Sequence, residues 1–531
     1  MNRIACRLPK LCGADIELGN FVLGERQGEM TGAEASRAVL REIDGLPRNP
    51  WTSIAHGNGM TYDPQDWGRK YLPANGGCVY LDLDHVEACV PEVRSAYDHV
   101  AAWHAMLRIV RAAQARANAK RPASQPIQIL VNNSDGRSNS YGSHLSFLVS
   151  RATWDAIFNR KVQYQLFLAA FQASSIVVTG QGKVGAENGA PAVAYQIAQR
   201  ADFFETVCSQ QTTYHRPVVN SRDEPLCGPT PRWNPAASPA RLHCIFFDNT
   251  LCHVASLLKV GLMQIILAMI EAEQVDTRLL LEDPVAAVRC WSHDPTLRAH
   301  ASLVSAKQVT AVDLQLLFLG AAKEFVAGGG CDGIVPRAED ILGLWEDTLL
   351  KLQRGDLAAL AGRIDWILKL SILRRALHQR PHLTWDSPEI KMLDHLYSSL
   401  DPADGLYWAY ERSGAVERVV SDERIAHFET NPPEDTRAWT RAMLLRALDP
   451  EDIDAVDWDG IVLKSGYAGY QRTYRRIDLG DPLAFTQAEQ GAVFESSLDT
   501  DALLEALGAS PPAPRPAATH AIAGYGTGYV N

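Results

Sequence analysis

Alternation of acidic and aliphatic side chains in short segments is the feature of this sequence that most restricts its fold. In GADIEL (13–18), Asp15 and Glu17 alternate with three aliphatic residues. Successive side chains of a β-strand point to opposite faces of the sheet. This segment therefore predicts a strand with its aliphatic face on a core and its acidic face lining water or a binding site.

A second segment, which starts at Cys78 and reads CVYLDLDHVE, shows the same alternation. As a single strand it would carry Tyr80, Asp82 and Asp84 on one face, with valine and leucines on the other. Three further segments have the composition of strands: IQILVNN, SSIVVTG and RLHCIFFDN. The first half of the chain is therefore predicted to build strands with a polar face, together with helices.

Acidic side chains gathered on two strands repel one another unless cations compensate for their charge. Carboxylate oxygens suit magnesium, which usually also keeps water and phosphate oxygens among its ligands. His144 in SHLSF and His243 in RLHC could complete such a ligand set or hold a phosphate. An ordinary amphipathic sheet with a solvated acidic face is the alternative. The chain has no Walker P-loop, and TGQGKVG (179–185) reads as a turn.

Helical periodicity dominates two other regions. Residues 91–120 predict a long amphipathic helix, and the stretch from Asp276 to Arg380 is almost wholly helical in pattern. The longest apolar stretch begins at Ala255 and is interrupted by Lys259 and Gln264. It is predicted to be a buried core helix, too short to span a bilayer.

Changes in composition divide the chain into three parts. A large domain is expected over 1–425, with a helical part at about 276–400. A small C-terminal domain is expected over 426–507, because the prolines of NPPEDTRAW end the preceding segment and its acids suit a helix N-terminus. The last part, 508–531, is rich in Pro, Ala and Gly and is predicted to be a flexible tail.

Charge and cysteine content narrow the class of protein. The formal net charge of -11 argues against nonspecific nucleic-acid binding, which needs a basic surface. The ten cysteines form no C-x-x-C pair, so we expect reduced, mostly buried thiols in a cytoplasmic protein. The N-terminus has no long apolar region, so no secretory signal is expected.

A series of sequence blocks runs in one order along the chain: GADIELG, NGGCVYLDLDHVEACVPE, VNNSDGRSNSYGSHLSFLVSR, IVVTGQGKVG, IAQRADFFETVCSQQTTYHRPVVNSRDEP, RLHCIFFDN with LLKVG, RIDWILKL, YSSLDPADGLYW and NPPEDTRAWTRAMLLR. From Gly13 to Leu463 they resemble the blocks of the Pup ligase / Pup deamidase-depupylase family, whose second block reads N-G-A-R-L-Y-x-D-x-x-H-P-E-Y-x-x-P-E. The resemblance implies an enzyme that uses ATP and magnesium to make or break amide bonds at the side-chain carboxyl of a small protein modifier. It also implies an α+β fold like that of glutamine synthetase and other carboxylate-amine ligases, with a curved antiparallel sheet cradling ATP, helices behind the sheet and a small C-terminal domain.

The resemblance assigns catalytic roles to three residues. Asp82 matches the catalytic carboxylate of the family's Tyr-x-Asp segment, and Tyr80 matches its tyrosine. Arg222, in NSRDEP, matches an arginine expected to hold phosphate or the substrate carboxylate. Asp82 is the first candidate for the chemistry.

The resemblance also assigns cofactor ligands, which are Asp15, Glu17, Glu87, His144 and His243 for magnesium, with the two histidines also near phosphate. Asp15 replaces a glutamate of the family, which keeps the charge and shortens the reach. Arg437 and Arg441 match arginines near the nucleotide and lie four residues apart on one helical face. A solvated surface pair is the alternative for these two.

Two features favour the hydrolase branch over the ligase branch. The spacing Asp82-x-x-His85-x-Glu87 lacks the extra residue that the ligase carries before its histidine, and the insertion between Gly19 and Asn75 is longer than the ligase needs. The predicted function is a deamidase-depupylase that cleaves the C-terminal Gln amide or Glu–Lys isopeptide of a Pup-like or ubiquitin-like modifier. Its partners would be that modifier, its lysine conjugates and a proteasome-like protease, without nucleic acid or membrane.

Several departures from the family pattern keep alternatives open. The family's H-E-N becomes His144-Leu145-Ser146, a glutamate is lost at His253, and the segment 48–73 matches neither branch. The alternatives are a Pup ligase-like enzyme acting through an acyl phosphate, a small-molecule carboxylate-amine ligase, and a noncatalytic nucleotide-binding regulator.

Overall fold

The structure is a computed structural model of the chain and describes residues 7–24, 32–47, 68–224, 226–227, 238–496 and 498–514. Most of the segment 48–73 and most of the predicted tail lie outside these ranges. The expectation of a flexible tail therefore stays a prediction for these residues.

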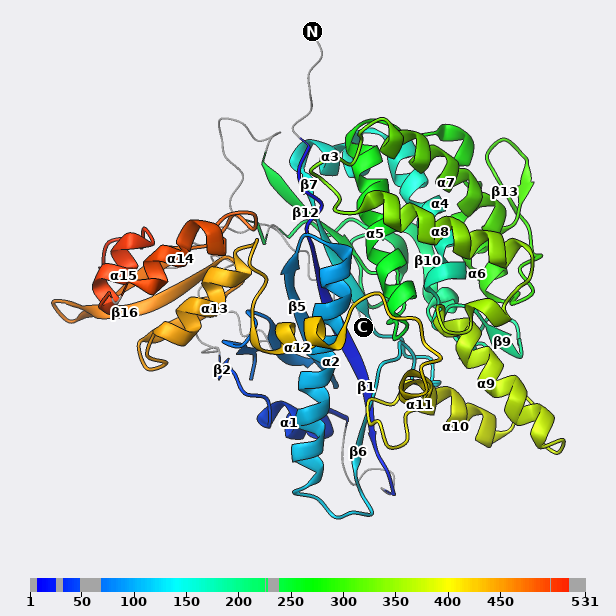
Figure 1. Cartoon of the computed structure of the whole chain (residues 1–531), viewed down its shortest axis with the longest axis horizontal. Helices are drawn as coiled ribbons and strands as arrows, with labels where there is room; N and C mark the ends of the chain where they lie inside the picture. The colour runs from blue at the N-terminus through cyan, green and yellow to red at the C-terminus, as the bar shows by residue number, and fades with distance from the viewer. Residues whose placement is uncertain are drawn as a thin grey trace, which may run out of the picture.

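In the described ranges, an eight-stranded antiparallel sheet forms the middle of the molecule (Figure 1). Its strands follow the order β12-β7-β1-β5-β4-β3-β2, and β6 pairs with β1. The bounds are β1 (Cys12–Val22), β2 (Leu46–Pro47), β3 (Lys70–Tyr71), β4 (Cys78–Asp82), β5 (His85–Val93), β6 (Ile127–Leu130), β7 (Ser143–Ser150) and β12 (Pro239–Cys244). The antiparallel sheet and the α+β class agree with the sequence-based expectation.

Helices cover the aliphatic face of the sheet. Ile16, Val86 and Ala88 are fully buried there, in one core with α2 (Ala96–Asn118) and α5 (His253–Glu271). Behind these two helices pack α4 (Val162–Thr179), α6 (Pro284–Ser292), α7 (Ala311–Ala327), α8 (Ala338–Gln353) and α9 (Asp365–Gln379). The almost wholly helical pattern expected from 276 to 380 is confirmed, apart from the short pair β13 (Ala301–Ser302) and β14 (Gln308–Val309).

The remaining elements of the large part connect or border these layers. They are α1 (Gly32–Arg41), α3 (Arg151–Asp155), β8 (Lys183–Val184), β9 (Tyr195–Gln196), β10 (Phe204–Ser209), β11 (Arg216–Asn220), α10 (Pro388–Tyr397), α11 (Leu406–Arg412) and α12 (Asp422–Thr430).

In the part of the chain that the structure describes, two helices, α4 and α5, are long and apolar enough to cross a membrane by length and composition. The prediction that the apolar stretch in α5 is too short to do so is wrong, because the helix is 19 residues long. Burial accounts for both helices instead: 78% of the apolar window in α4 and all of that in α5 lie inside the protein. The expected core helix at this position is confirmed.

Three local predictions differ from the structure. SSIVVTG is the end of α4 and not a strand, because its β-branched residues continue a long apolar helix. The long helix predicted over 91–120 begins later, after the N-cap Ser95, since the residues up to Val93 belong to β5.

The third difference concerns CVYLDLDHVE, which is a hairpin and not one strand. β4 ends at Asp82, β5 begins at His85, and Leu83 and Asp84 form the loop between them. Leu83 has φ 49° and is 75% exposed, so it does not belong to an apolar strand face. Asp84 likewise does not share a strand face with Asp82.

A C-terminal part packs against the polar side of the sheet (Figure 1). It contains α13 (Ala438–Ala447), β15 (Ile453–Asp457), β16 (Gly460–Ala468), β17 (Gln471–Asp478), α14 (Gln487–Glu495), α15 (Thr500–Ala506) and β18 (Ala513–Pro514). Leu444, Leu445 and Ile461 share a hydrophobic cluster with Tyr71 and Cys78 of the large sheet. Because β18 pairs with β17, the four-stranded C-terminal sheet extends past residue 507, where the tail was expected to have begun.

Candidate active site

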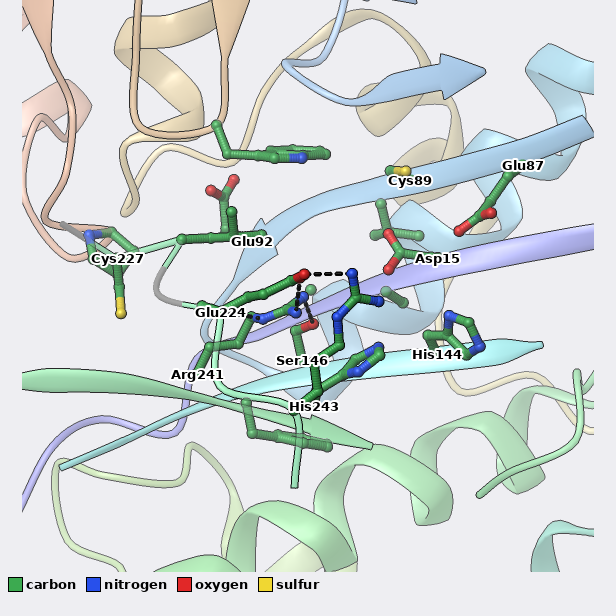
Figure 2. A pocket seen from close by; sticks show the side chains of 18 of the residues that line it. Asp15, Glu87, Cys89, Glu92, His144, Ser146, Glu224, Cys227, Arg241 and His243 are labelled. Carbon is green, nitrogen blue, oxygen red and sulfur yellow. Dashed lines mark hydrogen bonds and ion pairs between the residues drawn. The ribbon is translucent and has the colours of Figure 1, made fainter. Parts of the chain in front are cut away.

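A cavity of about 530 Å³ lies between the polar face of the large sheet and the C-terminal part. Its walls come from β1, β4, β5, β7 and β12, from the segment that follows β11, and from C-terminal residues such as Trp458. Figure 2 shows the acids and histidines of the sheet on one side, with Glu224 and Arg241 next to them. Acidic, imidazole and guanidinium groups thus converge on one space.

Strand register explains why residues far apart in the sequence meet here. Asp15 on β1 is paired with Cys89 on β5 and with His144 on β7. One step along the sheet, Glu17 is paired with Glu87, which is paired in turn with Tyr80 on β4. Cross-strand partners share a face, so these side chains form rows across the sheet.

Asp15, Glu87 and His144 form a cluster able to hold a metal ion. One ligand atom from each lies within 4.8 Å of the others, and Figure 2 shows the three side chains together. Burial raises the pKa of Asp15, and burial followed by the charges of Asp15 and Glu17 raises the pKa of Glu87. Burial lowers the pKa of His144 to about 3, so its imidazole is neutral at physiological pH and can act as a ligand.

Within the described residues, Glu87 Oε2 is buried and has no hydrogen-bond partner. A buried carboxylate oxygen without a partner, beside another acid, is stabilised by a cation. Oxygen ligands of this kind suit magnesium, so the cluster fits the metal that the sequence led us to expect.

Glu17 and His243 lie next to this cluster, and each interacts with residues outside it. Glu17 accepts hydrogen bonds from His85 Nδ1 at 2.9 Å and from the amide of Gly142. Burial raises the pKa of Glu17, but the hydrogen bond and charge of His85, the charge of His144 and the Gly142 amide together outweigh this effect, and the pKa is lowered. The ring of His243 lies 5.2 Å from that of His144, and its Nδ1 is 3.2 Å from Asn220 Oδ1.

The expected catalytic residues border the same cavity. Asp82 and Tyr80 lie on one face of β4, and Asp82 is paired across the hairpin with His85. Arg222 forms an ion pair with Glu224, which also pairs with Arg241 at 2.9 Å. Two guanidinium groups therefore share one carboxylate at the cavity wall, which is a setting where a phosphate or carboxylate of a ligand can bind.

Arg437 and Arg441 are not a solvated surface pair, because both side chains are buried. Arg437 Nε donates to Glu92 Oε1 at 2.7 Å, and Arg441 Nη2 donates to Glu92 Oε2 at 2.6 Å. Their other nitrogens donate to main-chain carbonyls, among them those of Leu479 and Gly76. The structure therefore makes these residues a buried clasp between the two parts of the chain, and Arg437 alone of the two borders the cavity.

Sequence reasoning missed several residues of the site. Arg241 and Glu224 lie inside motif blocks and could have been singled out by their charge. Glu92 ends the block that contains Asp82, but its two arginine partners are more than 340 residues away in sequence. Arg69 lies in the segment 48–73, which matched no motif, so no signal pointed to it.

Comparison with known proteins relates most of this chain to one family. Residues 11–462 match the family model described as Pup-ligase protein. The chain is 33% identical over 433 residues to the depupylase of Acidothermus cellulolyticus, which covers 82% of each chain. It is 34% identical over 442 residues to the Pup deamidase/depupylase of Mycobacterium tuberculosis, covering 82% of this chain and 83% of that one. The Pup–protein ligase of Acidimicrobium ferrooxidans is 33% identical over 427 residues, which are 79% of this chain and 88% of the ligase.

Solved structures of the Pup ligase PafA resemble this one. The Pup ligase PafA in complex with ADP has a TM-score of 0.67 and 26% identity, over 80% of this chain and 89% of that chain. The complex between Pup and its ligase PafA has a TM-score of 0.74 and 24% identity over 92% of each chain, and it supports the fold alone.

Proposed function

The chain belongs to the Pup-ligase protein family, and we propose that it is an ATP- and magnesium-dependent deamidase-depupylase-like hydrolase. Its substrates would be the C-terminal Gln amide or the Glu–Lys isopeptide of a Pup-like protein modifier. The family consists of carboxylate-amine ligase-type enzymes with a glutamine synthetase-like α+β fold, and this chain shares that fold.

The direction of the reaction is supported above all by the hairpin that carries Asp82. Its loop contains two residues, Leu83 and Asp84, so Asp82 and His85 face each other directly across β4 and β5. The ligase pattern has one more residue before its histidine, which would lengthen this loop and change that pairing. Relatives named depupylase are 33–34% identical and a relative named Pup–protein ligase is 33% identical, so the proposed direction depends on the hairpin and not on these identities.

In this proposal Asp82, which lines the cavity, acts on the carbonyl carbon of the glutamyl side chain. Its carboxylate can attack that carbon as a nucleophile, or it can take a proton from a water molecule that attacks. Cleavage of the amide with water gives a glutamate and ammonia, and cleavage of the isopeptide gives a glutamate and a free lysine amine. Arg222 and Arg241 would orient the anionic groups of the ligands.

The ADP complex of PafA supports nucleotide binding in this family. Magnesium would be held by Asp15, Glu87 and His144, with Glu17 and His243 beside them. Bound magnesium would polarise phosphate or carbonyl oxygens by its charge. The residues of this chain supply the remaining functions: they fix the ligands, border the cavity and present Asp82.

A small Pup-like modifier is the proposed partner, and its lysine conjugates are the proposed substrates in the depupylation reaction. A cytoplasmic location, a proteasome-like protease that uses the same modifier, and the absence of nucleic-acid binding remain proposals. The mostly buried cysteines support the cytoplasmic location, and the net charge of -11 supports the absence of nucleic-acid binding.

Calorimetry with ATP and magnesium tests the cofactor assignment. We expect wild-type protein to bind Mg-ATP, and Glu87→Gln to weaken that affinity by about tenfold or more, because it removes a charged ligand. ATP with a chelator is the matched control and should bind both proteins equally. Failure of wild-type protein to bind at millimolar nucleotide contradicts the assignment.

Arg222→Lys tests the role of the guanidinium at the cavity wall. We expect kcat/KM to fall by about tenfold, because lysine loses one charge-assisted hydrogen bond of about 1.5 kcal/mol while the fold persists. Arg278→Lys is the control, since Arg278 also pairs with an acid, Asp276, but is 87% exposed on another part of the surface. Equal kinetics for wild type and Arg222→Lys would rule out the role.

The ligase alternative makes a different prediction for the same assay. A ligase would consume ATP stoichiometrically and join a modifier ending in glutamate to a lysine-containing protein. A hydrolase would release ammonia from a modifier ending in glutamine and would free conjugated proteins. Mass spectrometry of the modifier and measurement of ADP in one experiment separate the two reactions.

A further inference from the structure

A cationic side chain that no sequence motif singled out lies against the catalytic face. Arg69 precedes β3, is 9% exposed and lines the cavity. Its guanidinium carbon lies 3.6 Å from the centroid of the Tyr80 ring, and its Nη1 lies 3.7 Å from Cys78 Sγ. Arg69 therefore covers the ring of Tyr80, one of the catalytic candidates on β4.

Tyr80 connects this cation to the metal-ligand cluster. It is paired in register with Glu87, so the two side chains lie on the same face of the sheet. Burial raises the pKa of Glu87, and the phenol of Tyr80 acts on that carboxyl in the opposite direction. Glu87 is one of the three clustered ligands, so the position of Tyr80 influences where the Glu87 carboxylate points. Partners of this kind, one step behind the ligands, commonly fix ligand orientation and metal affinity.

We propose that Arg69 is a positioning residue for the metal site: it holds the ring of Tyr80 from one face, and Tyr80 orients Glu87 toward a divalent cation. The inference rests on the proposed function, which supplies the cation. A planar guanidinium stacks on an aromatic ring, and the contact stabilises most where water is excluded, as it is around Arg69. The charge of Arg69 also acts on Asp15 and offsets part of the repulsion among the buried acids.

Arg69 lies close to the first residue of β4. That residue is Cys78, two positions before Tyr80. Arg69 approaches the side chain of Cys78 from a segment outside β4 and brings a guanidinium to that place. A guanidinium therefore lies beside the start of β4, although Arg69 belongs to another segment of the chain.

Binding of Mn²⁺, followed by electron paramagnetic resonance as a stand-in for Mg²⁺, tests the proposal. We expect Arg69→Met, which keeps much of the side-chain volume and removes the charge, to weaken Mn²⁺ binding by about tenfold. Arg337→Met is the matched control, because Arg337 lies 3.7 Å from the ring centroid of Tyr97, away from the cavity. It should bind Mn²⁺ like wild type, and equal affinities for wild type and Arg69→Met would overturn the proposal.

A relocated arginine separates positioning from a general effect on folding. Arg69→Ala vacates the space beside Cys78, and the double variant Arg69→Ala/Cys78→Arg returns a guanidinium to it from β4. We expect Arg69→Ala to lose Mn²⁺ affinity and the double variant to regain most of it. If Arg69→Met does not fold, the double variant decides, and a folded double variant that stays weak overturns the inference. If wild-type protein does not bind Mn²⁺, both the metal site and the role of Arg69 are overturned. If wild-type protein binds Mn²⁺ but cleaves no Pup-like substrate, the proposed function fails and the role of Arg69 at the metal site stands.

Discussion

Asp82→Asn is expected to lower cleavage of a modifier–lysine isopeptide, and deamidation of a C-terminal glutamine, by about two orders of magnitude or more. Asparagine keeps the size of the side chain and most hydrogen bonds, but its amide is neither a nucleophile nor a base at neutral pH. Because Asp82 is the last residue of β4 and borders the cavity, the fold and nucleotide binding should persist. Mass spectrometry of a Pup-like substrate incubated with ATP and magnesium measures the loss.

Asp84→Asn is the matched control for this experiment. Asp84 is exposed in the hairpin loop, and its main-chain oxygen, which the substitution keeps, accepts hydrogen bonds from Asn20 and Ser36. We therefore expect near wild-type activity. Loss of activity in Asp84→Asn with retention in Asp82→Asn would show that the catalytic carboxylate has been assigned to the wrong residue of the hairpin.

Arg441→Met is expected to destabilise the protein by about 3 kcal/mol or more, because it removes one partner of a buried carboxylate. Arg441 is fully buried, donates to both oxygens of Glu92 and stacks 4.7 Å from the ring centroid of Trp458. Urea unfolding followed by tryptophan fluorescence measures the change. Arg446→Met on the same helix is the control: Arg446 donates to the exposed carbonyls of Pro73 and Ala74, so we expect a loss of about 1 kcal/mol.

The same clasp predicts how stability depends on pH. Burial raises the pKa of Glu92, but Arg441 and then Arg437 outweigh this, and the pKa falls from 4.5 to about 2. A carboxyl with a lowered pKa in the folded state stabilises the protein fully above its unfolded pKa and loses that contribution as the pH falls toward the folded value. Wild-type protein should therefore lose this stability between about pH 4.5 and 2, and Arg441→Met should lose less of it. Parallel acid-unfolding curves for the two proteins would contradict the assignment.

Alternation identified the polar face of the sheet correctly, but it did not determine where β4 ends. Asp15 and Glu17 were placed on one face from GADIEL alone, and the register confirms this. CVYLDLDHVE alternates across the hairpin loop as well, so a single strand and a hairpin have the same pattern. Leu83 adopts a positive φ that usually calls for glycine or asparagine, and this concealed the turn.

Contacts between distant segments account for what the sequence could not predict. The four-residue spacing of Arg437 and Arg441 predicts that they lie near each other on a helix. Their burial depends on the ion pairs with Glu92, which lies in another part of the chain. SSIVVTG is rich in β-branched residues and yet ends α4, because the apolar residues before it continue the helix. Arg69 belongs to a segment without any motif, and its role follows from the ring that it covers.

The rows of side chains across the large sheet have a consequence for how the protein matures. The three clustered ligands come from β1, β5 and β7, so they meet only after strands separated by up to about 130 residues of sequence have paired. A partly synthesised or partly folded chain cannot present the complete ligand set. A divalent cation bound there would therefore distinguish finished molecules from incomplete ones and would pull the folding equilibrium toward the native state by mass action.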